Sequence, residues 1–101
     1  MGAVAVTWVA RPPEDGAKPQ VGYATGRRVG PSVVRNRVRR QLQAIVAEIA
    51  EDLAPGIYLV SAGSKSSEMH FHGMRGNVWK ALQRLGALPE ELETHRNRLR
   101  Q

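Results

Sequence analysis

The chain has 101 residues, 42% of them hydrophobic and 5% aromatic, which supports one domain around a single core. It contains no cysteine, which excludes disulfide scaffolds, thiolate metal sites and cysteine nucleophiles and suits the cytoplasm, and no apolar run approaches the roughly 20 residues of a membrane span. The formal net charge of +6, from fifteen Lys and Arg against nine Asp and Glu, indicates a polyanionic partner.

The first quarter of the chain predicts two strands. Segment 3–10 is rich in valine and alternates Val4, Val6 and Trp8 with a second set of side chains, which is typical of a strand. Segment 11–19 carries three prolines and a Glu-Asp-Gly turn, so it predicts a loop, and segment 20–25 predicts a second strand. We expect the two strands to pair as an antiparallel hairpin.

Segment 31–53 predicts a long amphipathic helix. Pro31 suits the first helical position, and Gly30 is expected to be the cap. Apolar residues recur at steps of three and four, which places them on one face: Val34, Val38, Leu42, Ile45, Ile49 and Leu53. At about 100° per residue, Arg40 lies nearly opposite this face, Asn36 and Arg37 flank that position, Arg39 lies at the border and Arg35 lies near the apolar edge.

Six arginines and no acidic residue lie between positions 21 and 40: Arg27, Arg28, Arg35, Arg37, Arg39 and Arg40. Guanidinium binds phosphate through two hydrogen bonds and stacks on bases, which favours a nucleic acid over a merely solvated helix face. Four of these cations lie in the first half of the predicted helix, and its acidic residues lie at the end, against the helix dipole. Because that order costs local stability, we infer that the arginines bind an anion.

The second half of the chain predicts a strand and a helix. Segment 57–62 is almost continuously apolar, as in an interior strand, so the order strand, helix, strand predicts a crossover. A polar loop follows at 63–67, and a second amphipathic helix runs from Phe71 to Gly86, with Trp79 expected in the core or at the helix edge. We expect one domain over residues 1–87 and a helical or frayed tail over 88–101.

The ordered string VGYATGRRVGPSVVRNRVRRQL, from Val21 to Leu42, resembles the bacterial ribonuclease P protein family. It places a basic pair before Val-Gly and the sequence Arg-Asn-Arg-Val-Arg-Arg on a helix. The family usually has Lys-Lys at the basic pair and a further Arg-Glu after the helix motif, where this chain has Arg27-Arg28 and Gln43-Ala44. The resemblance covers about residues 3–85. Family members usually carry an opening helix before the first strand, and we expect this helix to be missing here.

The resemblance implies an α+β fold, a two-layer α/β sandwich with a small mixed sheet and a left-handed βαβ crossover. It also implies a protein subunit that works with a catalytic RNA, ribonuclease P RNA, which removes the 5′ leader of precursor tRNA with Mg²⁺ held mainly by the RNA. The leader-binding cleft of the family includes one face of the sheet. No protein partner and no membrane are expected. The sequence contains no convincing catalytic triad and no carboxylate cluster for a metal, so we expect no catalytic or metal-binding residue.

By position, the family's signature helix corresponds to Arg35, Asn36, Arg37, Arg39 and Arg40, and its basic pair corresponds to Arg27 and Arg28; all are expected to bind RNA. For Asn36 we favour an RNA contact over a purely structural role. Tyr23 and Trp8 are predicted to stack on the single-stranded leader. Packing in the core is an equal alternative for Trp8.

Two other functions and one metal site are alternatives to this interpretation. A non-catalytic RNA-binding or ribosome-associated module with the same βαβ topology would bind RNA without supporting cleavage. A DNA-binding protein is less favoured, because the arginine-rich helix also supplies the core and no dimer element is evident. His70, His72 and the distant His95 are disfavoured as metal ligands, since a helix start would splay the first two.

Overall fold

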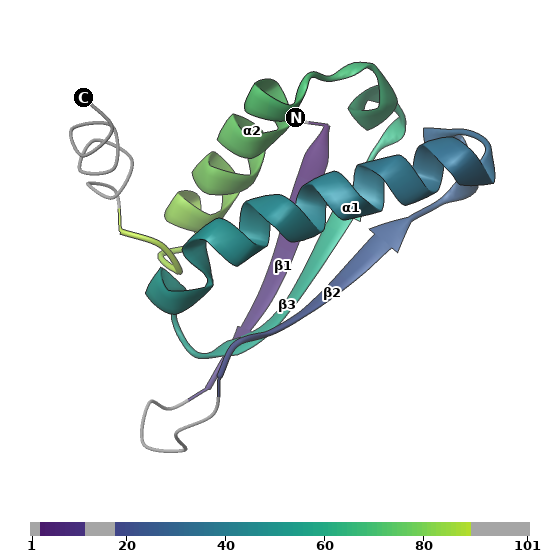
Figure 1. Cartoon of the computed structure of the whole chain (residues 1–101). Coiled ribbons are helices and arrows are strands. Elements are labelled where there is room, and N and C mark those ends of the chain that lie inside the picture. Colours follow the sequence, from purple (N-terminus) through teal and green to yellow (C-terminus); the bar gives the residue numbers. More distant parts are fainter. Residues whose placement is uncertain (1–2, 12–17, 90–101) are drawn as a thin grey trace.

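The structure is a computed structural model that describes residues 3–11 and 18–89. Its strands and longer helices form two layers (Figure 1). In chain order they are β1 (Val4–Ala10), β2 (Gln20–Thr25), α1 (Ser32–Ile49), β3 (Gly56–Ala62) and α2 (Phe71–Arg84). Short 3-10 turns connect them: η2 (Arg27–Val29), η3 (Ala50–Asp52) and η4 (Ser64–Glu68). The predicted elements are therefore confirmed, and the predicted loop at 63–67 contains η4.

The sheet has the order β1-β3-β2, with β3 in the centre. β3 pairs antiparallel with β1, where Val60 lies opposite Val6, and parallel with β2, where Val60 lies beside Tyr23. The predicted β1–β2 hairpin is therefore wrong. Segment 11–19 separates two strands that run in opposite directions, but the most continuously apolar strand takes the central position, where both of its edges find backbone partners.

The connection from β2 through α1 to β3 is a left-handed crossover. In Figure 1, α1 lies in front of the sheet, β2 and β3 both run upward, and the chain passes from β2 on the right to β3 on its left. Crossovers between parallel strands are right-handed in about 98% of cases. The α+β sandwich with a left-handed crossover is thus confirmed.

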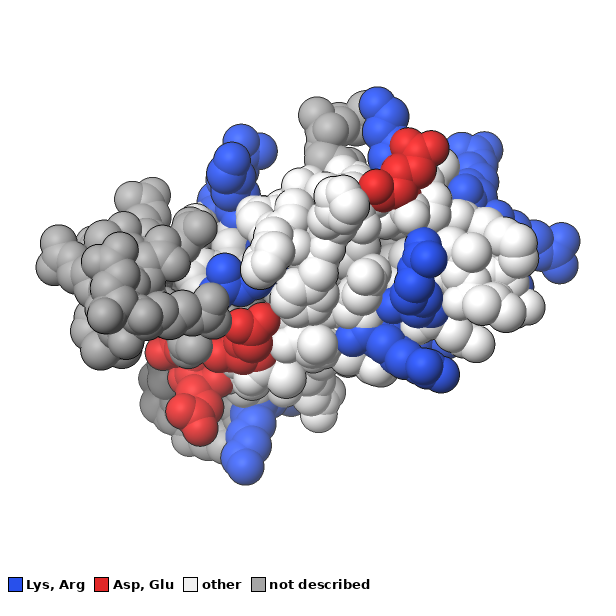
Figure 2. All heavy atoms as spheres, turned by 45° about the horizontal axis from the view of Figure 1, so that its top comes forward, with Lys and Arg blue, Asp and Glu red and all other residues white. Residues whose placement is uncertain are grey.

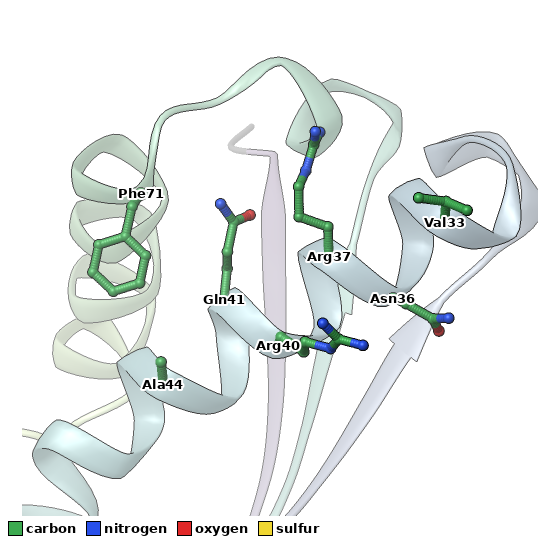
Figure 3. Close-up of a pocket in the computed structure, with 7 residues that line it drawn as sticks. All are labelled: Val33, Asn36, Arg37, Arg40, Gln41, Ala44 and Phe71. Atoms are coloured by element: carbon green, nitrogen blue, oxygen red, sulfur yellow. The ribbon is translucent and has the colours of Figure 1, made fainter.

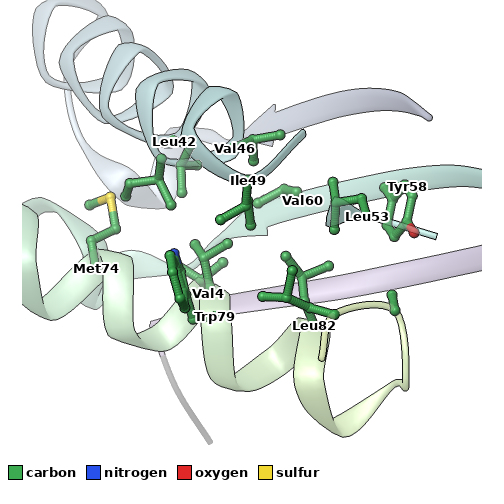
Figure 4. Packing of buried hydrophobic residues seen from close by; sticks show 14 of the residues in the cluster. Val4, Leu42, Val46, Ile49, Leu53, Tyr58, Val60, Met74, Trp79 and Leu82 are labelled. Atoms are coloured by element: carbon green, nitrogen blue, oxygen red, sulfur yellow. The ribbon is translucent and has the colours of Figure 1, made fainter. Parts of the chain in front are cut away.

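Both helices pack on one face of the sheet and enclose the core (Figure 4). Tyr58 and Val60 of β3 point into it and are about 1% exposed. The apolar stripe of α1 and the inward face of α2 complete the core with Val38, Leu42, Ile45, Ile49, Met74, Val78, Trp79 and Leu82. Trp79 is buried, as predicted. Burial of each Val, Leu, Ile or Met side chain contributes about 1.5–3 kcal/mol, so tertiary contacts hold both helices against the sheet.

The opposite face of the sheet is not covered by any residue that the structure describes. Val9, Ile57 and Leu59 are 60%, 41% and 45% exposed there. The register places Thr7 and Gly22 on either side of Leu59, so these residues form one continuous surface across the three strands. We call it the open sheet face.

The ends of α1 differ slightly from the prediction. Pro31 is the N-cap and Ser32 the first helical residue, so the prediction that Gly30 is the cap is wrong by one position. Gly30 instead adopts φ +145°, a conformation that other residues rarely reach, to turn the chain from η2 into α1. The helix ends at Ile49 and continues as η3. The predicted tail lies outside the described residues from position 90 onward.

Candidate nucleic-acid interface

The turn η2 places a basic pair beside the start of α1. Val29 is 3% exposed and belongs to the core, which anchors the turn. Arg27 and Arg28 precede it and are exposed. The N-terminus of α1 follows directly, and its first turn has no acidic residue and no side-chain cap. Two guanidinium groups and the positive end of the helix dipole therefore lie close together.

The arginines of α1 divide into two groups by exposure. Asn36, Arg37 and Arg40 are exposed, whereas Arg35 and Arg39 are half-buried along the edges of the apolar stripe. This division confirms the helical positions predicted from the sequence. The exposed group faces away from the sheet, where it is accessible to a large partner.

Two arginines are held by hydrogen bonds to neutral acceptors. Arg39 Nη2 donates to Thr25 Oγ1 at the end of β2, at 2.9 Å, and Arg37 Nη2 donates to the Ser67 carbonyl in η4, at 3.0 Å. Neither acceptor carries a negative charge, so these hydrogen bonds do not neutralise the positive charge of either guanidinium group. Because their conformations are already restricted, less side-chain entropy is lost when an anion binds.

The charge of this surface is not cancelled by the ion pair that the structure describes. That pair joins Arg75 of α2 to Glu48 of α1 at 3.5 Å, in the second half of the helix. The guanidinium of Arg75 also lies 4.5 Å above the ring of Trp79. In Figure 2, blue side chains lie on both halves of the visible face; the larger red group lies at lower left and a second red group lies among blue side chains at upper right.

A groove runs along the exposed side of α1 toward the start of α2 (Figure 3). It has a volume of about 590 Å³ and combines cationic, amide and apolar groups. Its lining residues are Val33, Asn36, Arg37, Arg40, Gln41, Ala44 and Phe71. The exposed members of the signature helix thus share one concave surface, together with a side chain from an element 30 residues further along the chain.

Metal-binding clusters and membrane-spanning helices are absent from the part of the chain that the structure describes. Within residues 3–11 and 18–89, no three His, Cys, Asp or Glu side chains gather closely enough to hold a metal ion. None of the helices described there has the length and apolar character needed to cross a membrane.

Comparison with known proteins identifies the family. The model of the family described as Ribonuclease P matches residues 3–86. The chain belongs to the ribonuclease P family. It is 34% identical over 77 residues to the ribonuclease P protein component of Symbiobacterium thermophilum and 40% identical over 60 residues to that of Beutenbergia cavernae. These matches cover 75% and 54% of this chain and 67% and 50% of the relatives, so the chain spans between half and two thirds of their length.

A solved structure confirms the ribonuclease P protein fold. The RNase P protein of Staphylococcus aureus superposes with a TM-score of 0.74, covering 85% of this chain and 77% of that one. Sequence identity in the superposition is 13%, so the likeness concerns the fold alone.

The two aromatic residues predicted to stack on a leader lie on the helix-covered side of the sheet. Trp8 is half-buried, stacks on Tyr58 with ring centroids 5.8 Å apart, and donates from Nε1 to the Pro55 carbonyl at 3.4 Å. Tyr23 packs against the core, and burial raises the pKa of its phenol. This placement favours the packing alternative for Trp8. A stacking role for either ring stays a prediction.

For this ribonuclease P family member, sequence reasoning predicted the helical positions of the α1 arginines but missed the groove. The periodicity of the second helix includes Phe71 without indicating the groove, and the apolar stripe predicted for α1 does not include Val33. Val33 is 79% exposed on α1, and this was foreseeable, because it falls outside the apolar stripe by helical angle. The proximity of Phe71 depends on how α2 packs, which no local pattern states.

Proposed function

We propose that this chain is the protein subunit of a ribonuclease P ribonucleoprotein, and that its partner RNA removes the 5′ leader of precursor tRNA in the cytoplasm. One observation carries the proposal. The family's fold presents a surface of exposed arginines on η2 and α1, including Arg27, Arg28 and Arg40, all within the matched region. That surface suits a folded RNA, whose backbone carries a dense array of phosphates.

Arginines with and without a hydrogen bond to the protein contribute differently to RNA binding. Arg27, Arg28 and Arg40 neutralise phosphates at the rim of the surface. Arg37 binds from a fixed position, because one of its nitrogens is already held by the Ser67 carbonyl. Asn36 has both donor and acceptor atoms, so it hydrogen-bonds a base edge, a sugar or a phosphate. Phosphate contacts of this kind fix register and orientation on the RNA.

The open sheet face is the proposed binding surface for the leader. It lies on the opposite side of the sheet from α1, and it exposes Val9, Ile57 and Leu59 with small or polar neighbours. An unpaired strand can place its bases on such an apolar surface. Trp8 and Tyr23 lie on the other side of the sheet, so they do not stack on the leader in this arrangement. The RNA subunit and the leader are then bound by opposite layers of the domain, which lets one chain hold both at once.

In this proposal Mg²⁺ is held mainly by the RNA, as the resemblance to the family implies. When bound there, the ion supplies the metal-ion chemistry of phosphodiester hydrolysis. The chain contributes by neutralising RNA phosphates and by orienting the RNA. Since phosphate repulsion opposes the compact RNA, added arginines lower the Mg²⁺ concentration that the RNA requires.

The test is reconstitution of cleavage. A bacterial ribonuclease P RNA is incubated with a precursor tRNA at low Mg²⁺, with and without this protein, and the 5′ end of the product is mapped. The proposal expects accurate cleavage only when the protein is present. Tight RNA binding without any gain in cleavage would favour the non-catalytic RNA-binding module instead.

A further inference from the structure

The groove between α1 and α2 has a wall that phosphate binding does not explain. Phe71 begins α2 and closes one end of the groove, across from Gln41 and Ala44 of α1 (Figure 3). Its ring is half-buried, so one part packs against the core and the rest borders the groove. A groove that served only to hold phosphates would need cations and amides and no aromatic side chain.

The position of this ring is fixed from two directions. On its own helix, the ring makes an edge contact with His72, with centroids 6.1 Å apart and planes 79° apart. Just before it, η4 is tied to α1 by the hydrogen bond from Arg37 to the Ser67 carbonyl. The ring and the guanidinium of Arg37 are therefore held on the same side of α1 before any partner binds.

The chemistry of the groove matches a single nucleotide. An aromatic face stacks on a base, an amide group such as that of Gln41 hydrogen-bonds its edge, and guanidinium groups bind its phosphate. In a duplex the faces of the bases are already covered by their neighbours, so only an unpaired nucleotide can use Phe71. The adjacent cations also disfavour a purely apolar peptide as the occupant.

We propose that this groove takes an unpaired nucleotide of the RNA on which α1 docks, with its base stacked on Phe71 and its phosphate on Arg37 and Arg40. The inference rests on the proposed function, because it assumes that α1 binds RNA. The proposed stacking adds recognition of RNA shape to the attraction between arginines and phosphates. The domain then selects a site where an unpaired base lies next to the phosphates that the arginines contact.

The test compares Phe71→Leu and Phe71→Tyr with the unmodified protein in binding to a bacterial ribonuclease P RNA. Phe71→Leu keeps an apolar side chain but removes the ring, so its dissociation constant should rise by at least about fivefold, the lower end for loss of a stacking platform. Phe71→Tyr keeps the ring and should bind within about twofold of the unmodified protein. Neither change removes a charge, so the salt dependence of binding should not change.

A second measurement needs no variant. Ultraviolet crosslinking of the complex, followed by trypsin digestion, should attach a nucleotide to the peptide of residues 66–75, which contains Phe71. Binding of Phe71→Leu within about twofold of the unmodified protein, or crosslinks confined to other peptides, would overturn the inference. Failure of the unmodified protein to bind the RNA at all would instead overturn the proposed function, so the two failures are distinguishable.

Discussion

Arg40 offers the cleanest perturbation of the charged surface. It is exposed on α1, nearly opposite the apolar stripe, and it lines the groove without belonging to the core. Replacement by glutamine keeps a polar side chain and removes one positive charge. We therefore expect Arg40→Gln to fold normally and to lose one phosphate contact with the RNA.

The expected size of the effect follows from counterion release. Each phosphate contact contributes about 0.7 to 0.9 to the slope of log affinity against log salt. If each of the six arginines contacts one phosphate, the slope is about −4 to −5. Arg40→Gln should make this slope shallower by about 0.7 to 0.9. Over a fourfold rise in salt, the ratio of the two dissociation constants should narrow by about threefold.

The assay is binding of a labelled ribonuclease P RNA at a series of KCl concentrations and fixed Mg²⁺. Arg84→Gln is a matched control, because Arg84 is an exposed arginine at the end of α2, outside the proposed interface. Its slope should equal that of the unmodified protein. If Arg40→Gln keeps the full slope, or if Arg84→Gln becomes equally shallow, the assignment of the interface to α1 is refuted.

Three further predictions concern the framework. Gly56→Ala should lower the free energy of unfolding in urea by about 3 kcal/mol or more, because Gly56 has φ +151° and an added Cβ would overlap Trp8 Nε1 and the Val9 carbonyl. Gly26 has open space around it, so Gly26→Ala should change the free energy of unfolding by less than about 0.5 kcal/mol. Equal losses in Gly56→Ala and Gly26→Ala would contradict the steric explanation. Burial raises the pKa of Tyr58 above its ordinary value, so its contribution to stability is present below about pH 10 and is lost as the pH rises through the folded-state pKa. The free energy of urea unfolding should therefore depend less on pH in Tyr58→Phe than in the unmodified protein between about pH 9 and 11. An unchanged pH dependence would exclude Tyr58 as its source. Thr25→Val removes the acceptor for Arg39 and should lower the free energy of unfolding by about 1 kcal/mol. Combining it with Arg39→Met should lower this free energy by less than the sum of the two single losses, because both variants remove the same hydrogen bond.

The sequence predicts α1 and its two faces well, because helical periodicity is a local property. Val38, Leu42 and Ile45 recur at steps of three and four, and that spacing alone separates the buried stripe from Asn36 and Arg40. The exposure of the arginines in the proposed interface follows from the same geometry. No contact with another element is needed to place them.

Strand order and the groove depend on contacts between distant segments. The loop between β1 and β2 predicts a reversal of direction, but the register of β3 with both strands is fixed by sheet pairing across 30 or more residues, from Gln20 to Ile57 and from Val9 to Ile57. Phe71 likewise reaches the groove only because α2 packs beside α1. Local patterns carry no information on such neighbours.

The central claim is that the exposed side of α1 and η2 joins this protein to a catalytic RNA, and single-turnover cleavage of a precursor tRNA tests it most directly. The rate is measured at low Mg²⁺ with ribonuclease P RNA and the unmodified protein, the double variant Asn36→Ala with Arg40→Gln, or Arg84→Gln. Our account predicts that the unmodified protein and Arg84→Gln restore cleavage at the same site, while the double variant remains folded and requires more protein or more Mg²⁺. Equal cleavage with all three proteins, or no restoration by the unmodified protein, would contradict it.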